Sequence, residues 1–102
     1  MKKEDLIIIK KKYLIFREDA RKISAIIQNK SKKEENKTFC LDFSKTSFFS
    51  RSFIDEFLNI VRDFKEKKLI IKTINLKPQL ERFLKRVEKK KQKIKKEITY
   101  QR

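Results

Sequence analysis

The sequence predicts an α/β fold, in which a helix joins two neighbouring strands of a sheet. The main observation is the segment from residue 39 to residue 75, which reads as a short apolar strand, a polar turn, a strongly apolar helix and a second apolar strand. Two further amphipathic helices, one before this segment and one after it, support the same class. The chain of 102 residues is long enough for one small domain with a single core.

The amino-terminal part predicts two strands and a helix. Two short apolar runs, at residues 6–9 and 13–16, flank three lysines, and we expect them to form an antiparallel hairpin. From residue 17 to residue 28, alanine and isoleucine recur at three- and four-residue spacing, which indicates an amphipathic helix packed on the sheet. Residues 29–37 contain no apolar side chain, so we expect a mobile surface loop there.

The central strand is predicted at residues 38–43. Three apolar side chains alternate onto one of its faces: Phe39, Leu41 and Phe43. Cys40 falls on the other face, and a small buried apolar role is favoured for it, because no histidine or second cysteine is present to activate its thiol. Asp42 ends the strand, where it is expected to accept hydrogen bonds from the following turn.

The central helix is predicted at residues 53–66. Its apolar stripe is wider than a surface helix requires, so it should be the most buried helix. Ser50 and Ser52 precede it, at the kind of junction where α/β proteins tend to build their sites. Because Asp55 follows Ser52 by three residues, we expect Ser52 to be the N-cap. The next strand, at residues 68–74, has a continuous apolar run that is typical of buried parallel pairing.

A final helix is predicted after Pro78. It carries four apolar side chains on one face: Leu80, Phe83, Leu84 and Val87. Beyond these the apolar residues thin out among lysines. We therefore expect a domain over residues 1–88 and a basic helical extension over residues 89–102, with a frayed, solvated tail as the alternative.

Several classes of site are excluded by composition. The sequence has no histidine and a single cysteine, so the commonest general base and metal ligand are absent and no structural zinc site can form. It has no glycine, which excludes glycine-rich phosphate-binding loops. We therefore expect no catalytic residue, no metal and no cofactor. No apolar run is long enough for a membrane span or a signal-peptide core, so we expect a cytoplasmic protein that binds no membrane.

The net charge of +16 has two interpretations. Thirty basic residues against 14 acidic ones create a field that attracts nucleic acid, anionic membranes or acidic proteins. Alternatively, a bias towards residues with A/T-rich codons has filled the solvated surface with lysine. The excess of 23 lysines over seven arginines favours the second interpretation, because arginine is preferred for bidentate phosphate recognition. Both interpretations stay open at this point.

Three stretches of the sequence resemble a known family. They are Leu-Asp-Phe-Ser at residues 41–44, the opening of the central helix at residues 48–57, and Asn75 after the last strand. In this order the chain resembles the STAS-like domains of unknown function, which are similar to the STAS domains of anti-sigma factor antagonists. The resemblance covers roughly residues 13–87. It implies a mixed four-stranded sheet with helices mainly on one face.

In those antagonists, the loop before the central helix carries Asp-Ser-Ser-Gly, and a kinase-type anti-sigma factor phosphorylates its first serine. Matching by length places Ser50 at the aspartate and Arg51 at the phosphorylated serine. Ser52 then matches the second serine and Phe53 the glycine. The phosphoacceptor is therefore missing from its usual place. Phosphorylation has either moved to Ser50 or Ser52, where a helix N-terminus receives negative charge well, or it has been lost.

These features predict a non-enzymatic regulatory protein–protein interaction module. Four residues form its expected docking or switch loop: Ser50, Arg51, Ser52 and Asp55. The resemblance implies a regulatory protein of the histidine-kinase-like ATPase class as the partner. We expect the protein to be a monomer or a weak dimer.

The alternative function is a basic nucleic-acid-associated protein that binds phosphates non-specifically through its lysine-rich carboxy-terminal helix. Six residues are the candidates for these contacts: Lys85, Arg86, Lys89, Lys90, Lys91 and Lys93. Tyr13 and most phenylalanines are expected in the core, which leaves few aromatic side chains to stack on bases and speaks against this alternative.

Overall fold

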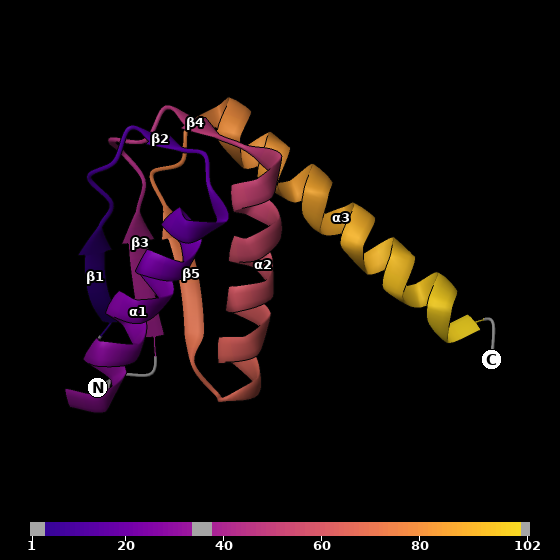
Figure 1. The fold of residues 1–102 in the computed structure, drawn as a ribbon, viewed down its shortest axis with the longest axis horizontal. Coiled ribbons are helices and arrows are strands. Elements are labelled where there is room, and N and C mark those ends of the chain that lie inside the picture. The colour runs from indigo at the N-terminus through magenta and orange to yellow at the C-terminus, as the bar shows by residue number, and fades with distance from the viewer. Residues whose placement is uncertain (1–3, 34–37, 101–102) are drawn as a thin grey trace.

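The computed structural model describes residues 4–33 and 38–100 (Figure 1). Within these ranges the elements are β1 (Glu4–Ile8), β2 (Tyr13–Leu14), α1 (Arg17–Lys33), β3 (Thr38–Asp42), β4 (Phe48–Phe49), α2 (Arg51–Glu66), β5 (Ile70–Ile74) and α3 (Pro78–Tyr100). All three predicted helices are present. α1 continues to Lys33 and so includes the first part of the predicted loop, whereas residues 34–37 of that loop lie outside the described residues.

The strands form two separate parallel sheets, and not the single mixed sheet of four strands that the family resemblance implies. The larger sheet has the order β1-β3-β5, and β2 pairs with β4 alone. The predicted antiparallel hairpin of residues 6–9 and 13–16 is therefore wrong. The lysines between the two runs supply no turn of the Asn-Gly kind that a tight hairpin favours. The chain crosses instead to the segment before α2, where Ser47 N–H donates to Lys12 O at 2.8 Å.

The predicted β-α-β unit is confirmed as β3-α2-β5. β3 and β5 pair in parallel, with Cys40 opposite Lys72. Phe39 and Leu41 are buried on the helix side of β3, as the alternation predicts. α2 contacts α1, α3 and β5. It is therefore enclosed between the sheet and its neighbouring helices, as its wide apolar stripe predicts.

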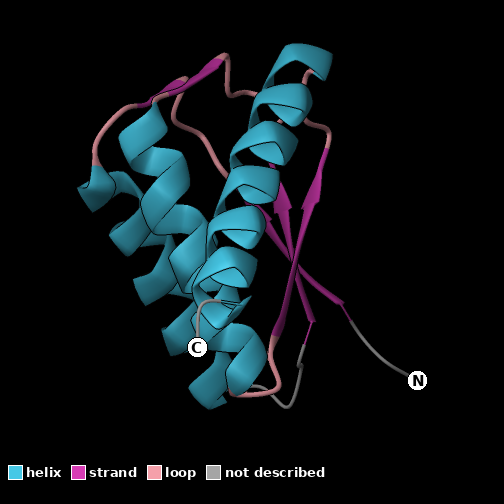
Figure 2. Ribbon diagram, turned by 90° about the vertical axis from the view of Figure 1, so that its right-hand side faces the viewer, coloured by secondary structure: helices cyan, strands magenta, loops and turns pink. Residues whose placement is uncertain are grey.

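All three helices lie on one side of the three-stranded sheet, and none of the described elements covers the other side (Figure 2). Side chains that face the helices, such as Leu41, are buried, whereas Leu6, Ile8 and Ile70 on the open face are each about half exposed. The continuous burial predicted for the apolar run of this strand is therefore wrong, because Ile70 is exposed and Leu69 and Ile71 are only partly buried. The predicted parallel pairing is correct. Parallel sheets usually have both faces covered, so the open face is unusual.

Four phenylalanine rings form the part of the core beneath the start of α2: Phe43, Phe49, Phe53 and Phe57. Phe53 and Phe57 stack with 5.6 Å between their ring centroids. Phe43 meets Phe57 edge-on at 6.0 Å and Phe49 at 5.4 Å. Phe43 follows β3 and Phe49 belongs to β4. The rings therefore fix the first turns of α2 against the carboxyl end of the sheet.

Helix α2 ends in a Schellman motif whose left-handed residue is a lysine. Leu69 N–H donates to Phe64 O at 2.8 Å, and Lys68 N–H donates to Lys65 O at 2.9 Å. The φ angle of Lys68 is 66°, and that of Asn75, after β5, is 58°. Glycine is the residue best suited to this conformation, but the sequence contains none. In the described part of the chain, a lysine and an asparagine therefore take left-handed positions that would suit glycine.

Candidate functional site

Helix α2 starts at a serine cap that also fastens a second segment of the chain. Ser50 has an extended backbone (φ −86°, ψ 162°), and its Oγ accepts a hydrogen bond from Phe53 N–H at 3.0 Å. The same hydroxyl donates to the carbonyl oxygen of Ile15. Ser50 N–H also donates to Leu14 O at 2.9 Å. The cap therefore joins the start of α2 to the segment at β2.

The N-cap is Ser50, so the predicted cap at Ser52 is wrong. Ser52 is the second residue of α2 and is exposed. The physical reason is that Phe53 is buried at the start of the helix, where its N–H has no partner within the helix. The hydroxyl of Ser50, three residues earlier, supplies the acceptor that this N–H needs. Because the N-cap is Ser50, Ser52 and Asp55 are both inside the helix and are not its capping box. Asp55 accepts a hydrogen bond from Arg51 Nε at 3.2 Å, so these two predicted loop residues are paired on the helix surface.

Replacing Ser50 by alanine should destabilise the domain by about 1–2 kcal/mol, because the helix cap is lost and its link to Ile15 is lost with it. Ser52→Ala is the matched control, since it removes the same hydroxyl from an exposed position two residues away. It should change the free energy of unfolding by less than about 0.5 kcal/mol. Urea unfolding monitored by circular dichroism measures both values. If Ser52→Ala lowered the free energy of unfolding by more than Ser50→Ala does, Ser52 and not Ser50 would be the N-cap.

Exposed apolar side chains lie on the two segments that meet at this cap. We call them the apolar patch: Tyr13, Ile15, Phe16 and Phe48. Their exposed fractions run from 42% for Ile15 to 64% for Phe16. Tyr13 and Phe48 are partners across the β2–β4 pair, and the next pair, Leu14 and Phe49, is buried.

The expectation that most phenylalanines belong to the core is correct, since six of the nine are buried. It is wrong for Phe16 and Phe48, and the expected burial of Tyr13 is wrong as well. The signal that a sequence offers here is weak, because β2 and β4 have only two residues each. In so short a strand, alternation separates the two faces but does not say which face is covered. The buried face of β2 can be assigned only when β4 is known to be its partner. The predicted hairpin paired this segment with residues 6–9 instead.

Asp19 fixes the segment that carries two members of the patch. Its carboxylate, 4% exposed, accepts hydrogen bonds from Ile15 N–H and Phe16 N–H, both at 3.1 Å, and from Lys11 Nζ at 2.7 Å. Asp19 is the third residue of α1, and it holds the amide that precedes the helix as the acid of a capping box does. Burial tends to raise the pKa of Asp19, but the hydrogen bonds from Lys11 and from the amides of Phe16 and Ile15 together hold it below its usual value.

One basic side chain lies against the apolar patch, and others are exposed on the segments that lead to it. Lys12 Nζ lies 5.5 Å from the centre of the Tyr13 ring, which is a cation–π contact. Lys10 and Lys45, on the chain segments that lead to β2 and β4, are also exposed. A molecule that covers the patch would therefore meet apolar contacts and positive charge together.

Polar groups at the carboxyl ends of β3 and β5 have structural roles. Asp42 Oδ1 accepts hydrogen bonds from Ser44 N–H at 2.9 Å and from Asn75 Nδ2 at 3.2 Å. These bonds, that from the Ser44 amide first, hold the pKa of Asp42 below its usual value. Asp42 thus receives donors from the turn, as predicted. Across the described parts of the chain, no three histidine, cysteine or acidic side chains gather where they would bind a metal ion.

Cys40 is buried on the open side of the sheet. Its Sγ donates to Glu4 Oε2 at 3.2 Å, and Lys72 Nζ donates to Glu4 Oε1 at 2.7 Å. Burial, followed by the neighbouring Glu4 carboxylate, raises the pKa of the Cys40 thiol. The thiol therefore stays protonated at neutral pH and is a poor nucleophile, which agrees with the structural role favoured for it.

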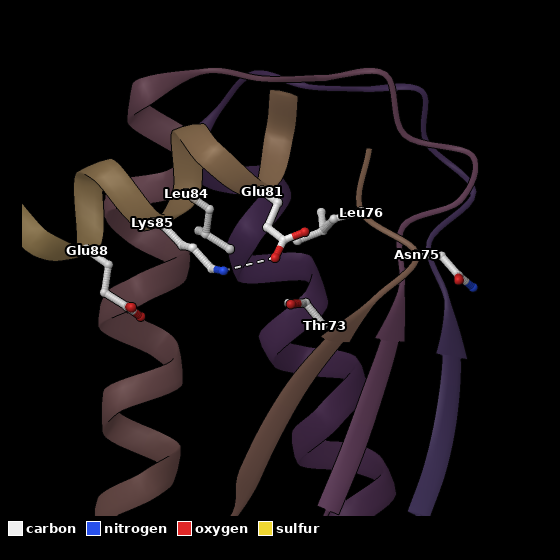
Figure 3. Close-up of a pocket in the computed structure, with 7 residues that line it drawn as sticks. All are labelled: Thr73, Asn75, Leu76, Glu81, Leu84, Lys85 and Glu88. Atoms are coloured by element: carbon white, nitrogen blue, oxygen red, sulfur yellow. Dashed lines mark ion pairs between the residues drawn. The ribbon is translucent and has the colours of Figure 1, made fainter. Parts of the chain in front are cut away.

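A pocket of about 320 Å³ lies between the end of β5 and α3 (Figure 3). It is lined by Thr73, Asn75, Leu76, Glu81, Leu84, Lys85 and Glu88. Lys85, one of the residues predicted to contact nucleic acid, forms an ion pair with Glu81 at 3.0 Å. The pocket includes no residue of the predicted docking loop and none of the apolar patch, so it is a separate feature.

The other residues predicted to contact nucleic acid also belong to α3. Arg86, Lys89 and Lys90 are exposed, whereas the side chains of Lys91 and Lys93 lie outside the described part of the structure. α3 runs without a break across residue 88. The division into a domain of residues 1–88 and an extension of residues 89–102 stays a prediction.

None of the helices in the described ranges combines the length and the apolar composition that crossing a bilayer requires.

Comparisons with known proteins identify the family. Searches among curated proteins and among solved structures give no match. The model of one family, described as STAS-like domain of unknown function (DUF4325), matches residues 19–78, which is more than half of the chain. The match extends from Asp19, through the cap at Ser50, to the first residue of α3. The chain therefore belongs to the family of STAS-like domains of unknown function.

Proposed function

We propose that this STAS-like domain is a non-enzymatic regulatory module that docks a partner protein on the apolar patch and the first turn of α2. The observation that carries the proposal is the patch itself, in which three aromatic side chains and Ile15 stay exposed beside the capped helix. Aromatic side chains are enriched in the centres of protein interfaces, because each one buries a large area with few rotatable bonds.

The patch is held in position before a partner binds. Asp19 fixes the backbone amides of Ile15 and Phe16. Ser50 ties the carbonyl oxygen of Ile15 to the start of α2. The buried Thr46 hydroxyl donates to Lys11 O at 2.9 Å and fastens the chain just before β2. A surface ordered in advance loses less conformational entropy on binding, which favours a docking role over that of a flexible loop.

The partner that we propose is a regulatory ATPase of the histidine-kinase-like class, as the family resemblance implies. Its docking surface should be apolar in the centre and acidic around it, because Lys12 lies over the Tyr13 ring and because Lys10 and Lys45 are exposed on the chain segments that lead to β2 and β4. The net charge of +16 would steer such a partner and increase its association rate at low salt.

Any regulatory phosphorylation belongs, in this proposal, to Ser52 and not to Ser50. The Ser50 hydroxyl both accepts from Phe53 N–H and donates to Ile15 O, so a phosphoryl group there would remove the cap. Ser52 is exposed in the first turn of α2 and follows Arg51. Added negative charge at that place is stabilised by the helix dipole and changes the surface that the partner contacts.

The variants Phe16→Ala and Tyr13→Ala should each weaken binding of the ATPase by about 30-fold or more, since an interface anchor contributes about 2 kcal/mol. Isothermal titration calorimetry with purified histidine-kinase-like ATPases from the same genome measures this effect. Ser52→Asp should also change the affinity while the melting temperature stays close to that of the wild type.

Leu6→Ala is the control for the patch variants. It truncates an apolar side chain of comparable exposure on the open face of the sheet, which is a different surface, and it should leave the affinity unchanged. If Phe16→Ala and Tyr13→Ala bind the ATPase as tightly as the wild type does at low salt, the patch is not the docking surface. The family membership then describes the fold alone.

A further inference from the structure

Half of the net positive charge of the chain is concentrated in its last fifth. Residues 82–102 contain ten lysines or arginines and two glutamates, whereas residues 1–81 contain 20 basic and 12 acidic residues. The net charge is therefore +8 in each part, although the first is about four times longer. A bias towards A/T-rich codons would favour both lysine and glutamate at exposed positions. It does not by itself account for ten basic residues against two acidic ones in this part of the chain.

Helix α3 is longer than its packing requires. Leu80 and Val87 are buried, and Phe83 and Leu84 pack against the core. All four lie in the first ten residues of a 23-residue helix. Figure 1 shows the remainder of α3 extending away from the body of the domain. The 13 residues from position 88 to position 100 span about 20 Å of helix.

We call residues 86–96 of α3 the basic arm. The arm contains six lysines, one arginine and one glutamate. With a rise of about 1.5 Å per residue, a positive charge recurs about every 2.4 Å along the helix axis. Duplex DNA carries one negative charge per about 1.7 Å of its axis. The two linear charge densities are therefore similar in size and opposite in sign.

The like charges of the basic arm also oppose its helix. Arg86 and Lys90, like Lys89 and Lys93, are spaced four residues apart. Each such pair destabilises a helix by a few tenths of a kcal/mol, about 0.2–0.5. A polyanion beside the arm would remove this repulsion. The ion pair of Lys85 with Glu81 at 3.0 Å lies just before the arm, so Lys85 is not counted among its charges.

We infer that the basic arm binds the phosphate backbone of double-stranded DNA. A helix with its side chains is about 10–12 Å across, and the major groove of B-DNA is about 12 Å wide. The major groove of A-form RNA is too narrow for a helix. Lysine contacts phosphates as a point charge and lacks the bidentate fork of arginine. The arm therefore recognises charge and groove width without reading base sequence.

An anionic membrane surface fits the arm less well. A helix that lies in a membrane interface needs a continuous apolar face, and between Glu88 and Lys96 the one apolar residue is Ile94. The arm and the apolar patch belong to different elements, so DNA binding does not depend on the docking function proposed above. Together the two surfaces would place a regulatory partner beside DNA.

The salt dependence of DNA binding by the full-length protein tests this inference. The test variant replaces three exposed charges of the arm: Arg86→Gln, Lys89→Gln and Lys90→Gln. The control replaces one arginine and two lysines, all exposed, at the end of α2: Arg62→Gln, Lys65→Gln and Lys67→Gln. Both variants have the same net charge, and glutamine is a good helix former. Thermal unfolding should give the same midpoint for the test variant and the wild type.

Fluorescence anisotropy with a labelled, mixed-sequence DNA duplex gives the affinity between about 50 and 200 mM salt. Each lost phosphate contact lowers the slope of log K against log salt by about 0.9. The magnitude of this slope should therefore be smaller than in the wild type by about 2–3 for the arm variant, and by less than about 1 for the control variant. Equal slopes for the two variants would overturn the inference. So would a wild type that fails to bind the duplex at the lowest salt, or that binds anionic lipid vesicles more tightly than DNA.

Discussion

Phe57→Ala is expected to destabilise the domain by about 3–5 kcal/mol, the largest effect of any single substitution considered. Phe57 is buried, stacks on Phe53 with 5.6 Å between ring centroids, and receives the edge of Phe43 at 6.0 Å. Alanine would leave a cavity the size of a ring between the end of β3 and the start of α2. Domains of this size are stable by about 5–15 kcal/mol, so a large part of the folded population would be lost at physiological temperature.

Urea unfolding at 25 °C, followed by circular dichroism, measures the free energy of unfolding for Phe57→Ala. Phe48→Ala is the matched control, because it makes the same chemical change at a side chain that is about half exposed. It should cost much less, since little of the ring is removed from water on folding. Similar losses for the two variants would mean that the four phenylalanine rings do not form the centre of the core.

Asp19→Ala is expected to cost about 2–4 kcal/mol. The substitution leaves the amides of Ile15 and Phe16 without their acceptor, close to buried residues of α1. The contribution of Lys11 is smaller, because its side chain is 54% exposed and its ammonium group returns to water. Since Asp19 orders the backbone under Ile15 and Phe16, the variant should also lose affinity for a partner that docks on the apolar patch.

The stability that Asp19 contributes should depend on pH. The pKa of this carboxyl is lower in the folded protein than its ordinary value of 3.8. The contribution is therefore complete above the pKa of the unfolded chain, and it is lost as the pH falls through the lower pKa of the folded state. Chemical unfolding from neutral to acidic pH should show the gap between wild type and Asp19→Ala closing in acid.

Glu18→Gln provides the control for both experiments on Asp19. Glu18 is also an acid in the first turn of α1, but its side chain is exposed and its ion pair with Arg21 is long, at 3.9 Å. Such a surface pair contributes little. A loss for Glu18→Gln that equals that of Asp19→Ala would show that the helix dipole, and not the capping of Ile15 and Phe16, accounts for the effect.

The β3-α2-β5 unit could be predicted from sequence because its signals are local and strong. Alternation of Phe39, Leu41 and Phe43 defined the face of β3 that carries the core, and the width of the apolar stripe defined α2 as the enclosed helix. The amino-terminal runs were harder. An apolar run predicts a strand but not its partner, and the missing turn signal after β1 was the one indication that no hairpin forms there.

The candidate site was only partly predictable. The junction before α2 was found because a strand loop leads into a helix there, but the cap lies at Ser50 and not at Ser52. Both serines satisfy the N-cap preference, and the choice depends on contacts with Ile15, 35 residues away in the sequence. The exposure of Tyr13 and Phe48 likewise follows from pairing between segments that are distant in the chain, which local patterns do not contain.

The use of Lys68 and Asn75 in place of glycine at left-handed positions affects the unfolded chain as well as the folded one. A residue with a Cβ atom in this conformation costs about 1–2 kcal/mol compared with a right-handed one. Glycine would avoid that strain, but it loses about 0.5–1 kcal/mol more conformational entropy than alanine when it is ordered. A chain with no glycine at all has a denatured ensemble that samples fewer backbone conformations. Local strain at two turns is thereby offset by a smaller entropic cost of ordering the rest of the backbone, which helps a domain with one sheet face uncovered to stay folded.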